Sequence, residues 1–153
     1  MRGELYEERL TQSIIGAFYE VYNVLGIGLL EHHYAAALEC ELAARNHQVS
    51  REVPIDVWYK GVLLGRQRID LIVDGKVVIE TKATRELHAS AARQCFSYLR
   101  ASGIEIGLVL HFGPRPNVKR LVSRKGDRQG QLGIRHGQDT DLEGSNSEKS
   151  DQV

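Results

Sequence analysis

The feature that most constrains this fold is a change in the spacing of its apolar residues, from helical to alternating and back. Up to residue 46 the apolar side chains recur as on one face of a helix. From residue 49 to 82 they alternate and are rich in β-branched types, which is typical of strands, and the helical spacing returns over 86–102. A chain with this order has to pack helices against a sheet.

Glycine-containing breaks divide the pattern into separate elements. Thr11 is a plausible cap for the first helix, and Gly103 ends the last one. Lys60-Gly61 and Asp74-Gly75 are turn signals between antiparallel strands. In chain order we expect two helices, three strands, a helix and two strands, over residues 12–25, 29–46, 49–61, 62–73, 76–82, 86–102, 104–112 and 118–122. This order predicts an α/β fold, a mixed β-sheet flanked by helices.

A single domain accounts for most of the 153 residues. We place it at residues 1–122. Residues 123–153 contain hardly any large apolar side chains, so they cannot offset the entropy of ordering, and we expect a disordered C-terminal tail. No apolar run approaches the roughly 18 residues that span a bilayer, and the N-terminus is too polar for a signal peptide. We therefore expect a cytoplasmic protein with no membrane contact.

The hairpin RIDLIVDGKVVIETK, residues 68–82, carries two acids and a lysine within its apolar pattern. A two-residue Asp74-Gly75 loop would pair Ile69 with Glu80 and so turn that carboxylate into the apolar face. Burying an unpaired carboxylate is strongly unfavourable. The two-residue loop is therefore the less favourable register.

A three-residue loop over 73–75 removes this conflict. It pairs Leu71 with Val77 and Ile69 with Ile79, and it places the apolar residues of both strands on one face. In that register three charged side chains lie together on the opposite face: Asp70, Glu80 and Lys82, with Asp70 diagonal to Glu80.

Two neighbouring carboxylates repel by about 4 kcal/mol at a separation of about 4 Å and an effective dielectric constant of about 20. A positive charge has to lie between them. Lys82 supplies one, and two hard oxygen ligands also suit Mg²⁺. From the hairpin alone, an ordinary cross-strand ion pair on a solvated face is the favoured interpretation and a metal site the alternative.

The same residues resemble the PD-(D/E)xK nuclease superfamily, through Ile69-Asp70 and Glu80-Thr81-Lys82. The segment GLLEHHY, residues 28–34, resembles the GxxExxY signature of a family within it. Gln94 and Tyr98 resemble the QxxxY helix motif of RecB-like nucleases. The resemblance runs from about residue 11 to 122 and implies a restriction-endonuclease-like core.

The resemblance also implies a metal-dependent phosphodiesterase site. In it, Asp70, Glu80, Glu31 and the carbonyl of Thr81 would hold Mg²⁺ or Mn²⁺. Lys82 would orient the attacking water or help deprotonate it, and Gln94 would position Lys82 or the scissile phosphate. The substrate-binding candidates are Arg85, Arg93, Tyr98 and Arg100. Two of the site candidates also have simpler roles. The helix dipole favours an acid such as Glu31 in the first turn of a helix, and Tyr98 suits core packing.

The sequence supports two classes of function. One is a Mg²⁺-dependent nuclease whose partner is DNA or RNA. The other is a non-catalytic module of the same fold that acts by protein or nucleic-acid binding. The formal net charge of zero favours the module, because it argues against nucleic-acid binding by global electrostatics. The intact set of Asp70, Glu80 and Lys82 favours the enzyme.

Overall fold

The computed structural model describes residues 2–124 and 132–134. It contains α1 (Arg2–Leu25), α2 (Glu31–Ala44), β1 (Val49–Tyr59), β2 (Val62–Val73), β3 (Val77–Lys82), α3 (Ala89–Ser102), β4 (Ile106–Phe112), β5 (Pro116–Val122) and β6 (Leu132–Ile134). Every element expected from the sequence is present in the expected order. In the part of the chain that the structure describes, no helix is both long and apolar enough to cross a lipid bilayer.

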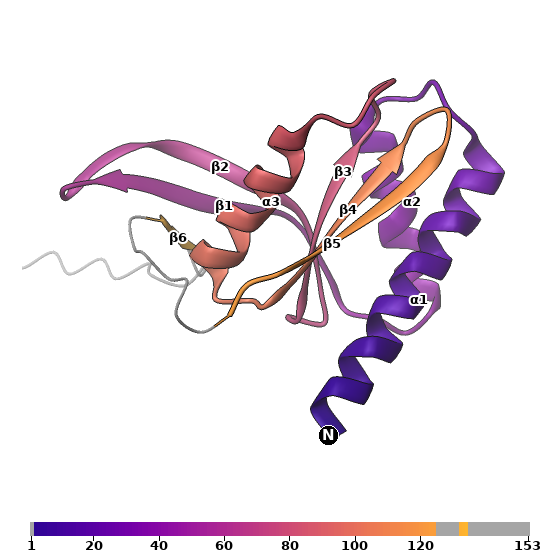
Figure 1. The fold of residues 1–153 in the computed structure, drawn as a ribbon, viewed down its shortest axis with the longest axis horizontal. Helices are drawn as coiled ribbons and strands as arrows, with labels where there is room; N and C mark the ends of the chain where they lie inside the picture. Colours follow the sequence, from indigo (N-terminus) through magenta and orange to yellow (C-terminus); the bar gives the residue numbers. More distant parts are fainter. Residues whose placement is uncertain (1, 125–131, 135–153) are drawn as a thin grey trace, which may run out of the picture.

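The strands form one sheet in the order β5-β4-β3-β2-β1-β6. β3 and β4 are parallel, because α3 connects them across the sheet, and the other neighbours are antiparallel. Figure 1 shows α3 on one face of the sheet and α1 with α2 on the other. The prediction of a mixed sheet flanked by helices is confirmed.

The central strands β3 and β4 are buried on both faces. On the α1 and α2 side, Ile14, Phe18 and Leu38 belong to one core cluster with Leu71 and Ile79 of the sheet. The cluster under α3 includes Ile72, Val78, Cys95 and Leu99. Successive side chains of β3 enter these two clusters in turn, Val77 and Ile79 the first and Val78 the second. Both faces are covered, so the strand is apolar at every position until Glu80.

The first helix is longer than the sequence pattern suggests. It begins at Arg2 rather than near residue 12, and Thr11 does not cap it. Thr11 lies in mid-helix, and its buried hydroxyl has no hydrogen-bond partner in the part of the chain that the structure describes. Leu10 joins the core, so packing against the sheet extends the helix through a segment whose polar sequence favours no particular start.

The loop between β2 and β3 has three residues, as expected, but it occupies 74–76 instead of 73–75. The observed pairs are Leu71 with Ile79, Ile72 with Val78 and Val73 with Val77. Asp74 and Gly75 both have left-handed backbones, with φ of 52° and 64°. The predicted pairing of Leu71 with Val77 is therefore wrong, because Leu71 pairs with Ile79.

Contacts from a distant segment account for the position of this loop. Asp74 Oδ1 accepts a hydrogen bond from Gln48 N at 2.8 Å, and Asp74 Oδ2 lies 2.8 Å from His47 Nδ1. Asp74 N in turn donates to Gln48 O at 2.8 Å. The segment between α2 and β1 therefore holds Asp74 in the turn.

The alternation in β2 predicts that Ile69 shares the core face of Leu71 and Val73, and this prediction is wrong. Ile69 lies in the cluster under α3, whereas Leu71 and Val73 lie in the cluster under α1 and α2. The side chains of β2 therefore exchange faces at Asp70. On the paired strand β1, Glu52 has a left-handed backbone, with φ of 50°. The irregularity accompanies a change in the direction of both strands.

The predicted tail begins at residue 123, and most of it falls outside the described residues. Within it the structure describes the short strand β6, which pairs with Ile55–Val57 of β1. The domain boundary at residue 122 stays a prediction.

Candidate active site at the fork of the sheet

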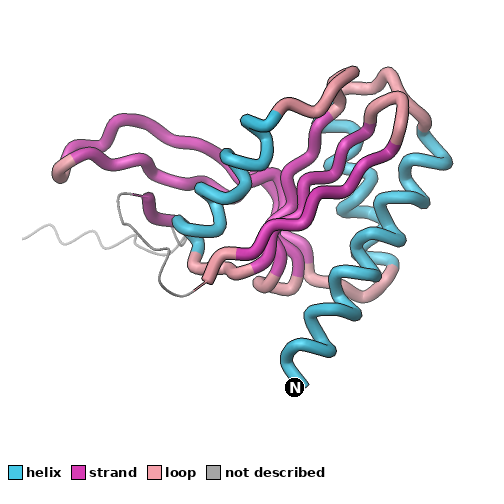
Figure 2. The backbone as a smooth tube through the Cα atoms, in the orientation of Figure 1, coloured by secondary structure: helices cyan, strands magenta, loops and turns pink. Residues whose placement is uncertain are grey.

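β2 and β3 form ladder pairs only near their shared turn. The paired residues are 71–73 of β2 and 77–79 of β3. Before residue 71, β2 stays with β1, whereas β3 continues beside β4 as far as the pair Lys82 and His111. Figure 2 shows the two pairs of strands separating as a fork. Asp70 and Glu80 are the first residues beyond the shared ladder on each strand.

Asp70 replaces the missing ladder partner of β3 with its side chain. Its Oδ2 accepts hydrogen bonds from Thr81 N and from Thr81 Oγ1, each at 2.8 Å. Among the described residues no hydrogen bond to Oδ1 is found. The carboxylate is therefore held rigidly by one oxygen, and the other remains available to a ligand.

Glu80 lies deeper in the fork and is 4% exposed. Its Oε1 is 3.3 Å from Lys82 Nζ, whereas its Oε2 is buried without a hydrogen-bond partner in the described structure. Burial raises the pKa of Glu80 to about 8, the charge of Asp70 adds to this and that of Glu31 adds less, while Lys82 opposes them. At pH 7 the carboxyl is therefore mostly protonated, a state that a nearby cation would reverse.

A chain of polar side chains connects Lys82 to α3. Lys82 Nζ donates to Gln94 Oε1 at 3.5 Å, and Gln94 Nε2 donates to Tyr98 Oη at 2.8 Å. Burial raises the pKa of Tyr98 to about 12, so its phenol stays protonated. The structure thus brings Gln94 to Lys82 as expected, and it places Tyr98 in the core, where Tyr98 anchors Gln94.

Glu31 reaches the same fork from the first turn of α2. Its Oε1 accepts a hydrogen bond from Ala83 N at 3.4 Å. It lines one pocket of about 540 Å³ together with Asp70 and Thr81. Glu31 therefore has both placements considered above, at the start of a helix and in one pocket with Asp70.

The other residues of the GLLEHHY segment shape the loop before α2. Gly28 has φ of 104°, a conformation that favours glycine. Tyr34 Oη donates to Gly26 O at 2.7 Å and accepts from Leu29 N at 3.2 Å. The Tyr34 ring stacks on Phe112 with centroids 4.1 Å apart. Tyr34 is thus a buried residue that fixes the loop and, through it, the start of the helix that carries Glu31.

The donor chemistry of the fork fits a hard divalent cation. Asp70 Oδ1 and Glu80 Oε2 are carboxylate oxygens without hydrogen-bond partners among the described residues. Such oxygens, completed by water, are the usual ligands of Mg²⁺. Within residues 2–124 and 132–134, no three His, Cys, Asp or Glu side chains are grouped closely enough to hold a metal ion by themselves. The set therefore suits an ion that retains waters, with Glu31 nearby.

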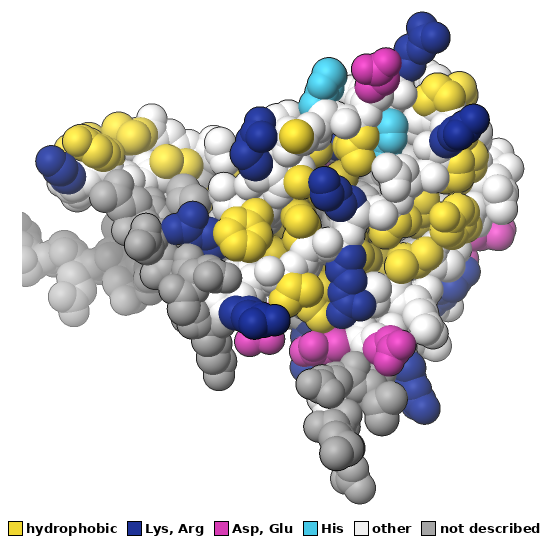
Figure 3. Space-filling view, viewed as in Figure 1, with side chains coloured by type: hydrophobic (Ala, Val, Ile, Leu, Met, Phe, Trp, Pro, Cys, Tyr) yellow, Lys and Arg dark blue, Asp and Glu magenta, His cyan; other side chains and the backbone are white. Residues whose placement is uncertain are grey.

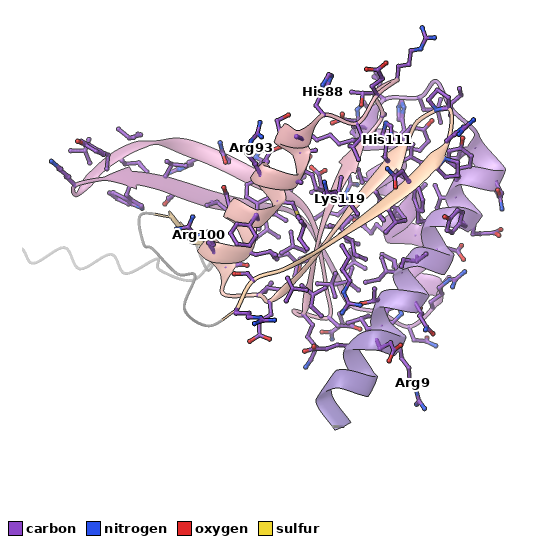
Figure 4. All side chains as sticks on the ribbon, viewed as in Figure 1. Arg9, His88, Arg93, Arg100, His111 and Lys119 are labelled. Carbon is purple, nitrogen blue, oxygen red and sulfur yellow. The ribbon has the colours of Figure 1, made fainter. Side chains whose placement is uncertain are left out.

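The three candidate arginines lie outside the pocket lining. Arg85 is exposed in the loop after β3. Figure 4 shows Arg93 and Arg100 on α3, away from the α1 and α2 side. Arg93 is exposed, whereas Arg100 is half-buried and its Nε has no hydrogen-bond partner in the described structure. Substrate binding by these three arginines stays a prediction.

Sequence reasoning missed several residues around the fork. Arg51 and Glu52 of β1 line the pocket, as do Leu29, Leu30, His32, Ala35 and Ala83. A correct strand register could have found Arg51, because it pairs with Leu71, next to Asp70. His111 is buried, and its Nε2 lies 2.6 Å from Thr84 O, so it holds the loop that follows Lys82.

Comparisons with known proteins agree with this architecture. The model of a family described as the PD-(D/E)XK nuclease superfamily matches residues 8–123. The crystal structure of SSO0001 is similar in fold, with a TM-score of 0.50 and 23% sequence identity. The match covers 80% of this chain and 62% of that one. No match to a curated protein was found.

Proposed function

Because the chain belongs to the PD-(D/E)XK nuclease superfamily, we propose that it is a metal-dependent nuclease that hydrolyses phosphodiester bonds in DNA or RNA at the fork. The observation that carries the proposal is the buried Glu80 Oε2, which has no hydrogen-bond partner among the described residues although it lies close to a second carboxylate, Asp70. Leaving a buried polar atom unpaired is unfavourable, and it persists most readily where a ligand completes the site.

Each residue of the fork has a distinct task in this proposal. Asp70 and Glu80 hold Mg²⁺ or Mn²⁺, with Glu31 and the carbonyl of Thr81 as further ligands. The chemistry that such an ion supplies is to acidify its bound water and to neutralise charge that develops on the phosphate. Lys82 orients the attacking water, and Gln94 holds the Lys82 ammonium in place. Arg85, Arg93 and Arg100 contact substrate phosphates.

We also propose that the chain is a member of the GxxExxY family. Support comes from the three positions of that motif, since Gly28 has a glycine-like backbone, Glu31 lines the pocket and Tyr34 fixes the loop between them. The motif thus connects the start of α2 to the fork.

The non-catalytic module remains the second candidate, because the formal net charge is zero and no three metal-ligating side chains form a group within the described residues. A cleavage assay separates the two. Single-stranded, duplex and branched DNA and RNA are incubated with the protein and Mg²⁺ or Mn²⁺, beside Asp70→Ala and the control Glu86→Gln on an exposed acid. The nuclease proposal expects cleavage by wild type and control alone. Equal activity of Asp70→Ala, or no cleavage of any substrate, would favour the module.

A further inference from the structure

β1 and β2 continue beyond the fork as a ribbon, which we call the arm, residues 54–68, and β6 pairs with the base of the arm at Ile55–Val57. Its pairs run from Pro54 with Arg68 to Tyr59 with Val62, with a bulge after Val57. Figures 1 and 2 show the arm extending away from the rest of the sheet. Residues 62–68 are all exposed. Beyond Val57 no further strand pairs with the described part of the arm, and a two-stranded ribbon is marginally stable, so the length of this exposed end needs a reason other than packing.

The end of the arm exposes large apolar side chains. Trp58 is 39% exposed, Tyr59 51% and Leu64 63%, and Val62 and Leu63 are exposed beside them. Figure 3 shows hydrophobic side chains gathered there, with a Lys or Arg side chain next to them. Contiguous exposed apolar residues of this kind mark a binding surface. Two of them are aromatic, and Lys60 Nζ lies 5.4 Å from the centroid of the Tyr59 ring.

The arm also concentrates positive charge in a chain of zero net charge. Its charged residues are Lys60, Arg66 and Arg68 against Asp56. Arg66 pairs with Asp56 at 3.2 Å, whereas the Arg68 side chain is 70% exposed and only 3.7 Å from Glu52 Oε2. Exposed ion pairs of the second kind contribute little, so Arg68 can exchange its partner for a phosphate.

The base of the arm connects to the candidate active site through Arg68. Glu52, the partner of Arg68, lines the same pocket as Asp70. Arg68 and Asp70 belong to one strand, and the nine residues from Asp70 to the turn at Gly61 span about 30 Å. A strand of nucleic acid that leaves the fork along β2 would therefore pass Arg68 before it reaches Tyr59 and Lys60.

We propose that the arm binds an unpaired strand of the substrate, with phosphates held by Lys60 and Arg68 and bases stacked on the aromatic end. The inference rests on the proposed nuclease function, which it deepens by naming the substrate class. Exposed aromatic rings together with cations are the features that bind single-stranded nucleic acid, because every base offers a π-face. A contact between two copies of the chain would use the apolar end but would leave the exposed Arg68 beside the fork unexplained.

Trp58 is the only tryptophan of the chain, so its fluorescence reports on the arm alone. The test titrates wild-type protein with a fluorescein-labelled oligothymidylate in EDTA, where no metal-dependent cleavage proceeds. We expect Trp58 emission to change and to saturate together with the anisotropy of the labelled strand. The duplex form of the strand should bind more weakly.

Three single variants refine the test without disturbing the fold. Tyr59→Ser should weaken binding roughly 5- to 150-fold, the range found for one stacked base. Arg68→Gln should reduce the steepness of log Kobs against log salt by about 0.7, the value for one phosphate on a single strand. Arg9→Gln is the matched control on α1, away from the arm in Figure 4, and it should change neither quantity.

The outcomes separate this inference from the nuclease proposal. Absence of strand binding, or binding that leaves Trp58 emission unchanged, overturns it. Trp58 emission could instead depend on protein concentration, and sedimentation could show a dimer that Tyr59→Ser abolishes. That result assigns the arm to contacts between copies and also overturns the inference. Binding in EDTA as expected without any cleavage in Mg²⁺ supports the arm and rejects the nuclease. Cleavage by Tyr59→Ser with an unchanged KM supports the nuclease and rejects strand binding by the arm.

Discussion

Replacing Glu80 by glutamine should make the metal-free protein less sensitive to rising pH. The pKa of Glu80 is raised from 4.5 to about 8, mainly by burial. The unfolded chain therefore loses this proton near pH 4.5, whereas the folded protein retains it up to about pH 8. Stability from the protonated carboxyl is fully present below pH 4.5 and is lost as pH rises through 8. Over this window the free energy of unfolding falls by about 1.4 kcal/mol per pH unit.

The Glu80→Gln side chain has the same shape and does not titrate. The difference in unfolding free energy, variant minus wild type, should therefore grow by about 3 kcal/mol between roughly pH 5.5 and pH 7.5. Solvent screening reduces this little, because the Glu80 side chain is almost fully buried. Over the whole window the effect approaches about 5 kcal/mol, a large fraction of the stability of a small domain.

Urea unfolding in EDTA, followed by far-ultraviolet circular dichroism at a series of pH values, measures this difference. Glu86→Gln is the matched control, since it makes the same change on an exposed acid a few residues away, and its profile should follow the wild type. Mg²⁺ should release protons from the wild type at pH 7, because the Glu80 carboxyl is mostly protonated there, and calorimetry in buffers of different ionisation enthalpy would show this release. Parallel pH profiles of wild type and Glu80→Gln would refute the reasoning.

Three further variants test other parts of the fork. Asp70→Asn should abolish the stabilisation by Mg²⁺, which is about 2.7 kcal/mol at a hundredfold excess over Kd, and thermal melts in which the variant still responds to Mg²⁺ would contradict this. Gln94→Leu should lower the single-turnover cleavage rate at least tenfold with unchanged strand affinity, because Lys82 loses its positioning partner; an equal loss of affinity would indicate a role in binding. Tyr34→Phe should lower the free energy of unfolding by about 1–3 kcal/mol, because Gly26 O and Leu29 N lose their partner, whereas the exposed Tyr19→Phe should stay within about 0.5 kcal/mol in the same urea experiment.

The apolar spacing was sufficient to predict the elements and their order. A helix that packs one side and a strand that alternates leave different periods in the sequence, and these periods survive whatever the detailed packing. The faces of the hairpin near its turn followed as well. One core cluster does contain Leu71, Val73, Val77 and Ile79. A three-residue loop at 73–75 and one at 74–76 both put these residues on the same face.

The position of that loop needed information from elsewhere in the chain. The same parity allows the loop at 73–75 or at 74–76, and the choice comes from the bonds of Asp74 to His47 and Gln48. The exchange of faces at Asp70 likewise follows from the irregular strand β1 and the covering helix α3, not from the alternation within β2. Both errors arose where long-range contacts decided between locally equivalent arrangements.

The candidate site divides in the same way. The sequence alone predicts that Asp70, Glu80 and Lys82 lie near one another, since they belong to adjacent strands of one hairpin and strand pairing is local. Only the tertiary structure adds Glu31 at Ala83, links Gln94 to Lys82 and seals Glu80 under α3. The raised pKa of Glu80 belongs to this second group, because desolvation depends on which atoms cover a carboxyl, and these come from segments far apart in the chain.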